Sequence, residues 1–354
     1  MEFVSLQDWL FYKQLIHFIY LAIGIITFLA IFSKRKLLEI PWGVTIFLTV
    51  LSIYLLGNFP DIINSESDKY NYYLEAQNIA NGRVTDRTSD IGFTALTKIL
   101  VTFPLKFYFY FLAILYVGGM CFFCKSISKR NAGLLFIGML LNFMFVSYGT
   151  NTIRAGVASS ILLTAIGCRK NKWLCFALLA FAVSVHKSWA LPAICYLLAR
   201  YRDKTKLFFG IWLLSIPISA IAGGSIQTLF ASLIGDERSS YFTTGIANTT
   251  YKIGFRLDFI LYSCAPIVIG YYYIYKKKFQ DKLYKNIYNM YILANTFWIL
   301  VIRANFSDRF AYLSWFLYSI VLLYPLVTAP NYIPNSKRLA AYTIMGLTIF
   351  YSLY

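Results

Sequence analysis

The sequence is poor in charge for its length. Of its 354 residues, only 14% are Asp, Glu, Lys or Arg, whereas 59% are hydrophobic. A water-soluble domain carries more charge than this, and it cannot hide so much apolar surface in one core. The composition therefore excludes an ordinary soluble protein and indicates that much of the chain lies in a lipid bilayer.

Acidic residues, histidine and paired cysteines are also scarce. The 15 Asp and Glu face 33 Lys and Arg, which gives a formal net charge of +18, and there are two histidines. Because the bases fall in short clusters between apolar runs, we expect no nucleic-acid partner. All six cysteines lie within or at the ends of apolar segments, and the one CxxC, Cys121 to Cys124, has no second pair or histidine nearby. We expect packed thiols there.

Long apolar runs make up much of the sequence. A helix needs about 20 apolar residues to cross a bilayer, and the runs are continuous and do not alternate as barrel strands do. The first run is followed by Ser33-Lys34-Arg35 and by no small-residue cleavage site, so we expect a retained anchor. We predict an all-α, polytopic integral membrane protein with a single transmembrane domain over 1–354. Its twelve candidate segments are 14–32, 41–57, 103–124, 132–149, 152–167, 173–186, 188–200, 207–223, 257–275, 286–302, 308–328 and 339–354.

Every second loop between these segments is basic. Such loops hold most of the 33 Lys and Arg residues, and cytoplasmic loops carry this excess. The alternation places both termini and the two longest loops, about 58–102 and 224–256, on the outer side. We interpret 58–102 as a folded lid at the interface. The basic loops are 34–36, 125–130, 169–172, 200–206, 276–285 and 337–338.

Several costly polar residues share the predicted outer level. Charges in lipid mark either helix-end anchors or a functional cavity, so two interpretations stay open: snorkelling or local pairing, as for Arg256 with Asp258, and a binding site. The planar fork of arginine suits a diphosphate, which it binds through two parallel hydrogen bonds. The candidate diphosphate-binding residues are Arg154, Arg256, Arg303 and Arg309.

The predicted outer level also contains candidates for a general base. His186 ends its segment there and titrates near neutral pH, whereas His17 lies inside the first segment. Lid carboxylates compete with it, chiefly Asp68 and Asp90. The remaining acidic rivals are Glu66, Glu75, Asp258 and Asp308.

Two weaker patterns lie in the predicted lid. Glu66-Ser67-Asp68 places two carboxylates two residues apart, which would hold a divalent cation or form a solvated turn. We expect no obligatory cofactor, and the cation remains an alternative. Tyr70, Tyr72 and Tyr73 would stack on sugar rings or belong to an interfacial aromatic belt.

The motifs resemble the EpsG/Wzy family of bacterial polysaccharide polymerases. Asn151-Thr-Ile-Arg154-Ala-Gly156-Val-Ala158 is similar to the family's Arg-x-Gly-x-Ala helix, and His186-Lys-Ser-Trp-Ala190 to its His-x-Ser-Ala. Weaker likenesses are Asp68-Lys-Tyr70-Asn-Tyr72 and Asp308-Arg309-Phe-Ala-Tyr312. Asp90-Ile-Gly92-Phe93 stands where the family often has Glu-Pro-Gly-Phe, so the acid and the glycine persist without the proline.

This resemblance implies a GT-C-like glycosyltransferase of O-antigen or exopolysaccharide synthesis. It would join oligosaccharide repeats carried on undecaprenyl diphosphate, both as donor and as acceptor, on the periplasmic or extracellular face of a bacterial plasma membrane. Membrane lipid, a chain-length regulator and a flippase are the implied partners. Three alternatives stay open: a related ligase, a metal-dependent lipid-sugar transferase using Glu66 and Asp68, and a flippase for the lipid-linked sugar.

Overall fold

The computed structural model is almost entirely helical in the part of the chain that it describes. One short parallel pair joins β1 (Phe3–Val4) to β2 (Asp61–Ile62). Among the described helices, five are long and apolar enough to cross a membrane, and six if one bent pair counts as a span. The protein is therefore a helical integral membrane protein. The structure describes residues 3–33, 39–62, 68–83, 90–233, 254–305 and 307–353.

The five long spans contain the longest uninterrupted apolar runs. They are α1 (Leu6–Ser33), η1 with α5 (Leu105–Phe107 and Tyr108–Ile127), most of α11 (Thr205–Leu233), α13 with the π-turn η4 (Leu257–Tyr271 and Tyr272–Lys276), and α15 with α16 (Ser307–Trp315 and Tyr318–Thr328).

The segment predicted at 132–149 is broken. It forms α6 (Ala132–Leu140) and α7 (Met144–Thr150), which are bent by 76° relative to each other. Asn142 lies at the break, is buried, and accepts a hydrogen bond from the Met144 amide through Oδ1 at 3.5 Å. A buried amide side chain that bonds to nearby backbone competes with helix continuation, which accounts for the bend.

The other predicted segments also lie on helices, but these are shorter or more polar than a single span. They are α2 (Trp42–Gly57), α8 (Ile153–Gly167), α9 (Lys172–Val185), α10 (Ala190–Tyr201), α14 (Lys282–Leu300) and α17 (Ser336–Leu353).

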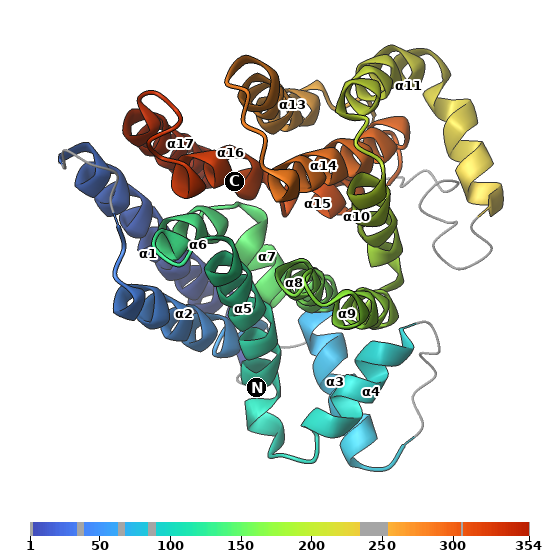
Figure 1. Cartoon of the computed structure of the whole chain (residues 1–354). Coiled ribbons are helices and arrows are strands. Elements are labelled where there is room, and N and C mark those ends of the chain that lie inside the picture. Colours follow the sequence, from blue (N-terminus) through green and yellow to red (C-terminus); the bar gives the residue numbers. More distant parts are fainter. Residues whose placement is uncertain are drawn as a thin grey trace. The chain divides into compact units, whose positions relative to one another are not determined.

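The chain divides into two compact units. The first contains Met1–Ala190 and Leu323–Tyr354, and the second contains Leu191–Leu322. In the first unit α8 packs between α5 and α9, α2 packs on α5, and α1 packs on α17 (Figure 1). Two further helices, α3 (Asp68–Ala80) and α4 (Ile91–Leu100), fall inside the predicted lid, and α4 packs on α9.

The second unit is built on the packing of α11 against α14. A polar chain runs through its core: the Trp212 indole donates to Asn295 Oδ1 at 2.9 Å, and Asn295 Nδ2 donates to Ser263 Oγ at 3.1 Å. The Trp315 indole donates to the same Ser263 hydroxyl at 2.7 Å. Such buried bonds between apolar helices hold the helices in one register.

Candidate active site

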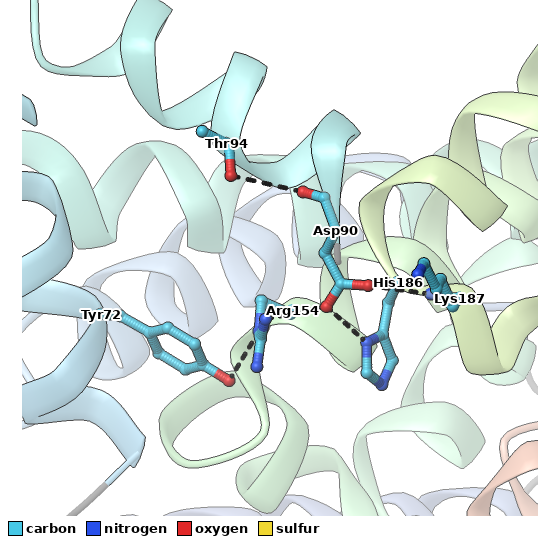
Figure 2. Close-up of polar contacts among 6 residues, drawn as sticks. All are labelled: Tyr72, Asp90, Thr94, Arg154, His186 and Lys187. Atoms are coloured by element: carbon cyan, nitrogen blue, oxygen red, sulfur yellow. Dashed lines mark hydrogen bonds and ion pairs between the residues drawn. The ribbon is translucent and has the colours of Figure 1, made fainter. Parts of the chain in front are cut away.

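One carboxylate joins the two strongest sequence candidates. Asp90 Oδ2 lies 2.8 Å from Arg154 Nη1 and 3.3 Å from His186 Nδ1. Asp90 precedes α4, Arg154 lies in the first turn of α8, and His186 ends α9. Figure 2 shows the three side chains converging from these three elements. All of them belong to the first unit.

Asp90 is held as an anion. Its side chain is 3% exposed, and the Lys187 amide donates to Oδ1 at 3.2 Å. Burial alone would raise its pKa, but the hydrogen bond from His186 and the charges of His186 and Arg154 hold the pKa well below its usual range. Asp90 therefore stays ionised at neutral pH and serves to bind and orient its neighbours.

Arg154 is fixed on two sides. Its Nε donates to the Tyr72 hydroxyl at 3.3 Å while Nη1 bonds to Asp90. The guanidinium carbon lies 5.3 Å from the centre of the Tyr72 ring and 5.9 Å from that of Phe93. Nη2 makes no hydrogen bond among the described residues, and the side chain is 21% exposed. The guanidinium is thus held in one orientation, with Nε and Nη1 engaged and Nη2 left over.

Two glycines bring the elements close enough to meet. A Cβ on Gly92 would lie 2.7 Å from the Ser184 carbonyl carbon and 2.8 Å from the Val185 nitrogen, so α4 touches the backbone at the end of α9. A Cβ on Gly156 would lie 2.3 Å from the Tyr148 carbonyl oxygen, so the start of α8 touches α7. The glycine in each of the Asp90 and Arg154 motifs therefore positions its charged neighbour.

His186 stands at a change of backbone direction. Its φ of −154° and ψ of 110° end α9, and the short helix η2 (Lys187–Trp189) follows. Trp189 is fully buried and packs edge-on to Tyr148, with 6.4 Å between the ring centres. This anchor holds the imidazole so that Nδ1 faces Asp90 and Nε2 lies on the far side of the ring (Figure 2).

A buried lysine on α3 was not predicted. Lys69 is 3% exposed, its ammonium donates to the Phe59 carbonyl, and it lies 4.5 Å from the centre of the Phe109 ring. Burial lowers the pKa of Lys69 to about 7, although the charge of Asp61 raises it. Lys69 and Tyr72 lie one turn apart on the buried face of α3, so Lys69 anchors the helix that supports Arg154.

The remaining lid candidates lie elsewhere or play a different part. Asp68 is the first residue of α3 and partly exposed, and Tyr70 and Tyr73 are half-buried. The Tyr72 side chain is 4% exposed, and its ring packs on Phe93 with 5.6 Å between the centres, so its sugar-stacking role stays a prediction. Glu66 lies outside the described residues.

The three other arginines belong to the second unit. Arg256 donates to both oxygens of Asp258, at 2.9 and 2.5 Å, and its guanidinium lies 3.7 Å from the centre of the Phe259 ring. The local pair considered from the sequence is therefore present. Arg309 is exposed on α15, and Arg303 lies just beyond the end of α14.

The described residues contain no group of three or more His, Cys, Asp or Glu side chains that could hold a metal ion. The predicted pair Glu66 and Asp68 is not tested by this, because Glu66 is outside those residues. All six cysteines are free thiols, and Cys121 and Cys124 are buried.

Comparison with known proteins identifies the family. The model of the EpsG family matches residues 64–354, which is most of the chain and includes every candidate described above. No curated protein matches the chain, and no solved structure does.

Proposed function

Since the chain belongs to the EpsG family, we propose that it is a polysaccharide polymerase of the GT-C type with about twelve membrane segments. The substrates would be oligosaccharide repeats linked to undecaprenyl diphosphate. The reaction would occur on the periplasmic or extracellular face of a bacterial plasma membrane. The observation that carries this proposal is the Asp90 carboxylate, which contacts both Arg154 and His186. Arginine is a residue type that binds phosphate, and histidine is one that acts as a base.

The donor's diphosphate binds at Arg154. Asp90 and Tyr72 occupy Nη1 and Nε, so Nη2 is the nitrogen that meets a phosphate oxygen. As the bond between the donor sugar and the diphosphate breaks, negative charge grows on the leaving oxygen. A guanidinium fixed in advance stabilises that charge more than the charge of the bound substrate, and this difference is what accelerates the reaction.

His186 takes the acceptor's proton. With the Nδ1 proton directed to Asp90, the neutral ring has its lone pair on Nε2. The acceptor hydroxyl attacks the anomeric carbon, its proton passes to Nε2, and Asp90 stabilises the imidazolium that forms. This is the division of labour between histidine and carboxylate in a catalytic triad. The diphosphate leaves as an anion and needs no proton.

Purified protein in proteoliposomes, supplied with defined undecaprenyl-diphosphate-linked repeats, tests the assignment. A polymerase yields a ladder of products that differ by one repeat. Transfer of a glycan in one step to another acceptor would instead indicate a ligase, and loss of the ladder on adding a chelator would indicate a metal-dependent transferase. Translocation of the lipid-linked sugar without any new glycosidic bond would indicate a flippase.

A further inference from the structure

Arg303 has no ion-pair partner among the described residues of its unit. Its Nη2 donates to the Ala220 carbonyl at 3.0 Å, and its guanidinium lies 5.9 Å from the centre of the Phe255 ring. Nε is buried and has no hydrogen-bond partner in the described part of the chain. Among the described residues no carboxylate lies within ion-pair distance of it. A half-buried cation without a counter-charge costs free energy that an anion would recover.

A second unsatisfied group lies beside it on α11. Ser219 is fully buried, and its hydroxyl has no hydrogen-bond partner among the described residues. One turn later, a Cβ on Gly223 would lie 2.9 Å from Arg303 Nε and 3.7 Å from Ser219 Oγ. Gly223 therefore lets the guanidinium approach the helix at the place where the serine hydroxyl is. Arg303 Nε and the Ser219 hydroxyl both lack a hydrogen-bond partner among the described residues, and both lie within 4 Å of the position that a Gly223 Cβ would take.

Arg256, in the same unit, has an ion-pair partner where Arg303 has none among the described residues. Both of its contacts to Asp258 are made, and its charge is neutralised locally. Arg303 lies just beyond the last residue of α14, at the end opposite to its basic start at Lys282, and Ser219 lies midway along α11.

We propose that Arg303 and Ser219 form a binding site for a phosphate oxyanion, bounded by Gly223. Guanidinium and hydroxyl donors together suit a phosphate, which offers several accepting oxygens while it remains attached to a larger molecule. Two sources supply this chemistry: an anionic phospholipid headgroup and a lipid-linked diphosphate. The site lies within the second unit and does not depend on the proposed polymerase activity.

Binding measurements on the intact protein test the site without any activity assay. The probes are inorganic pyrophosphate in detergent, and nanodiscs of phosphatidylglycerol compared with phosphatidylcholine. Arg303→Gln and Gly223→Ala should weaken pyrophosphate binding about tenfold or more, the loss typical of a hydrogen bond to a charged group. Gly224→Ala is the matched control, because a Cβ there meets nothing within 4 Å. Arg256→Gln should also bind as wild type does.

Ser219→Ala separates binding from folding. Its hydroxyl has no partner to lose, so the ligand-free variant should melt at or above the wild-type temperature while the stabilisation by pyrophosphate shrinks. A phospholipid source predicts that phosphatidylglycerol stabilises the wild type but not Arg303→Gln, and a diphosphate source predicts this for pyrophosphate alone. Either pattern supports the site. Equal binding by wild type and Arg303→Gln to both probes, or a Ser219→Ala variant that melts lower and responds fully to pyrophosphate, would overturn it.

Discussion

Asp90 and Arg154 are 64 positions apart in the chain, and a 2.8 Å contact between Oδ2 and Nη1 joins them. The carboxylate is buried and the guanidinium is partly exposed. The pair is therefore asymmetric: Asp90 faces the protein, and Arg154 keeps one side toward the surroundings. The same carboxylate oxygen reaches His186, so one buried charge orients both groups that the proposed reaction needs.

Removing the charge of Asp90 should lower the polymerisation rate strongly and affect the stability of the protein less. Asp90→Asn removes the counter-charge of Arg154 and the acceptor that selects the histidine tautomer. We expect a fall in polymerisation rate of about 10²–10⁴, as for other orienting carboxylates. The rate of ladder formation measures it, with Asp203→Asn on a basic loop as the control. A variant within threefold of wild type would show that Asp90 does not orient the pair.

Gly92→Ala should act through geometry alone. The new Cβ would meet the backbone of Ser184 and Val185, so α4 must move away from α9 and carry Asp90 with it. Ladder formation should fall at least tenfold. Gly118→Ala adds a Cβ to open space and should not change it. The new Cβ would also meet the Ser184 hydroxyl, but because backbone atoms remain within 2.8 Å of it, adding Ser184→Ala should not restore activity, and a restored double variant would contradict the explanation.

Tyr72→Phe distinguishes support of Arg154 from sugar stacking. The substitution keeps the ring and removes the hydroxyl that accepts from Arg154 Nε. A lost hydrogen bond to a charged group costs about 1.5–3 kcal/mol, so donor affinity should fall about ten- to a hundredfold. Steady-state kinetics with a varied donor concentration measures this. Kinetics identical to wild type would mean that only the ring matters.

Lys69 should make stability depend on pH. In the folded protein its pKa is about 7, whereas the unfolded chain has the ordinary value near 10.5. Between these values the unfolded chain binds a proton that the folded protein does not, so this contribution to stability rises with pH. Melting temperatures from pH 6 to 10 should rise by a few degrees more for wild type than for Lys69→Met. Lys98→Met, at an exposed position of α4, serves as control; equal slopes for wild type and Lys69→Met would refute the prediction.

The separation of interacting residues along the chain explains which features of the site could be predicted from the sequence. Arg154 and His186 were predicted because polar residues at the ends of apolar runs are conspicuous. Asp90 was predicted as one of several lid carboxylates competing for the role of base, but its contact with both residues was not, because it is 64 and 96 positions away from them. Gly92 offered a signal in hindsight: a glycine two residues after an acid, at the start of an apolar helix.

Other features had no local signal at all. Lys69 belongs to a polar stretch that reads as a solvated helix, and its contacts with the rings of Phe59 and Phe109 appear only in the folded chain. The bend between α6 and α7 was missed because one Asn in an apolar run is compatible with a straight span. Arg303 and Arg256 looked equivalent at the predicted outer level, and only their different partners separate them.

Ladder formation by matched pairs of variants tests the central claim most directly. Wild-type protein in proteoliposomes with defined lipid-linked repeats should produce the ladder, and so should His17→Ala and Arg169→Ala, which change the other histidine and a basic-loop arginine. Arg154→Ala and His186→Ala should each produce none, while both variants remain folded by their melting temperatures. An undiminished ladder from Arg154→Ala or His186→Ala would contradict the account.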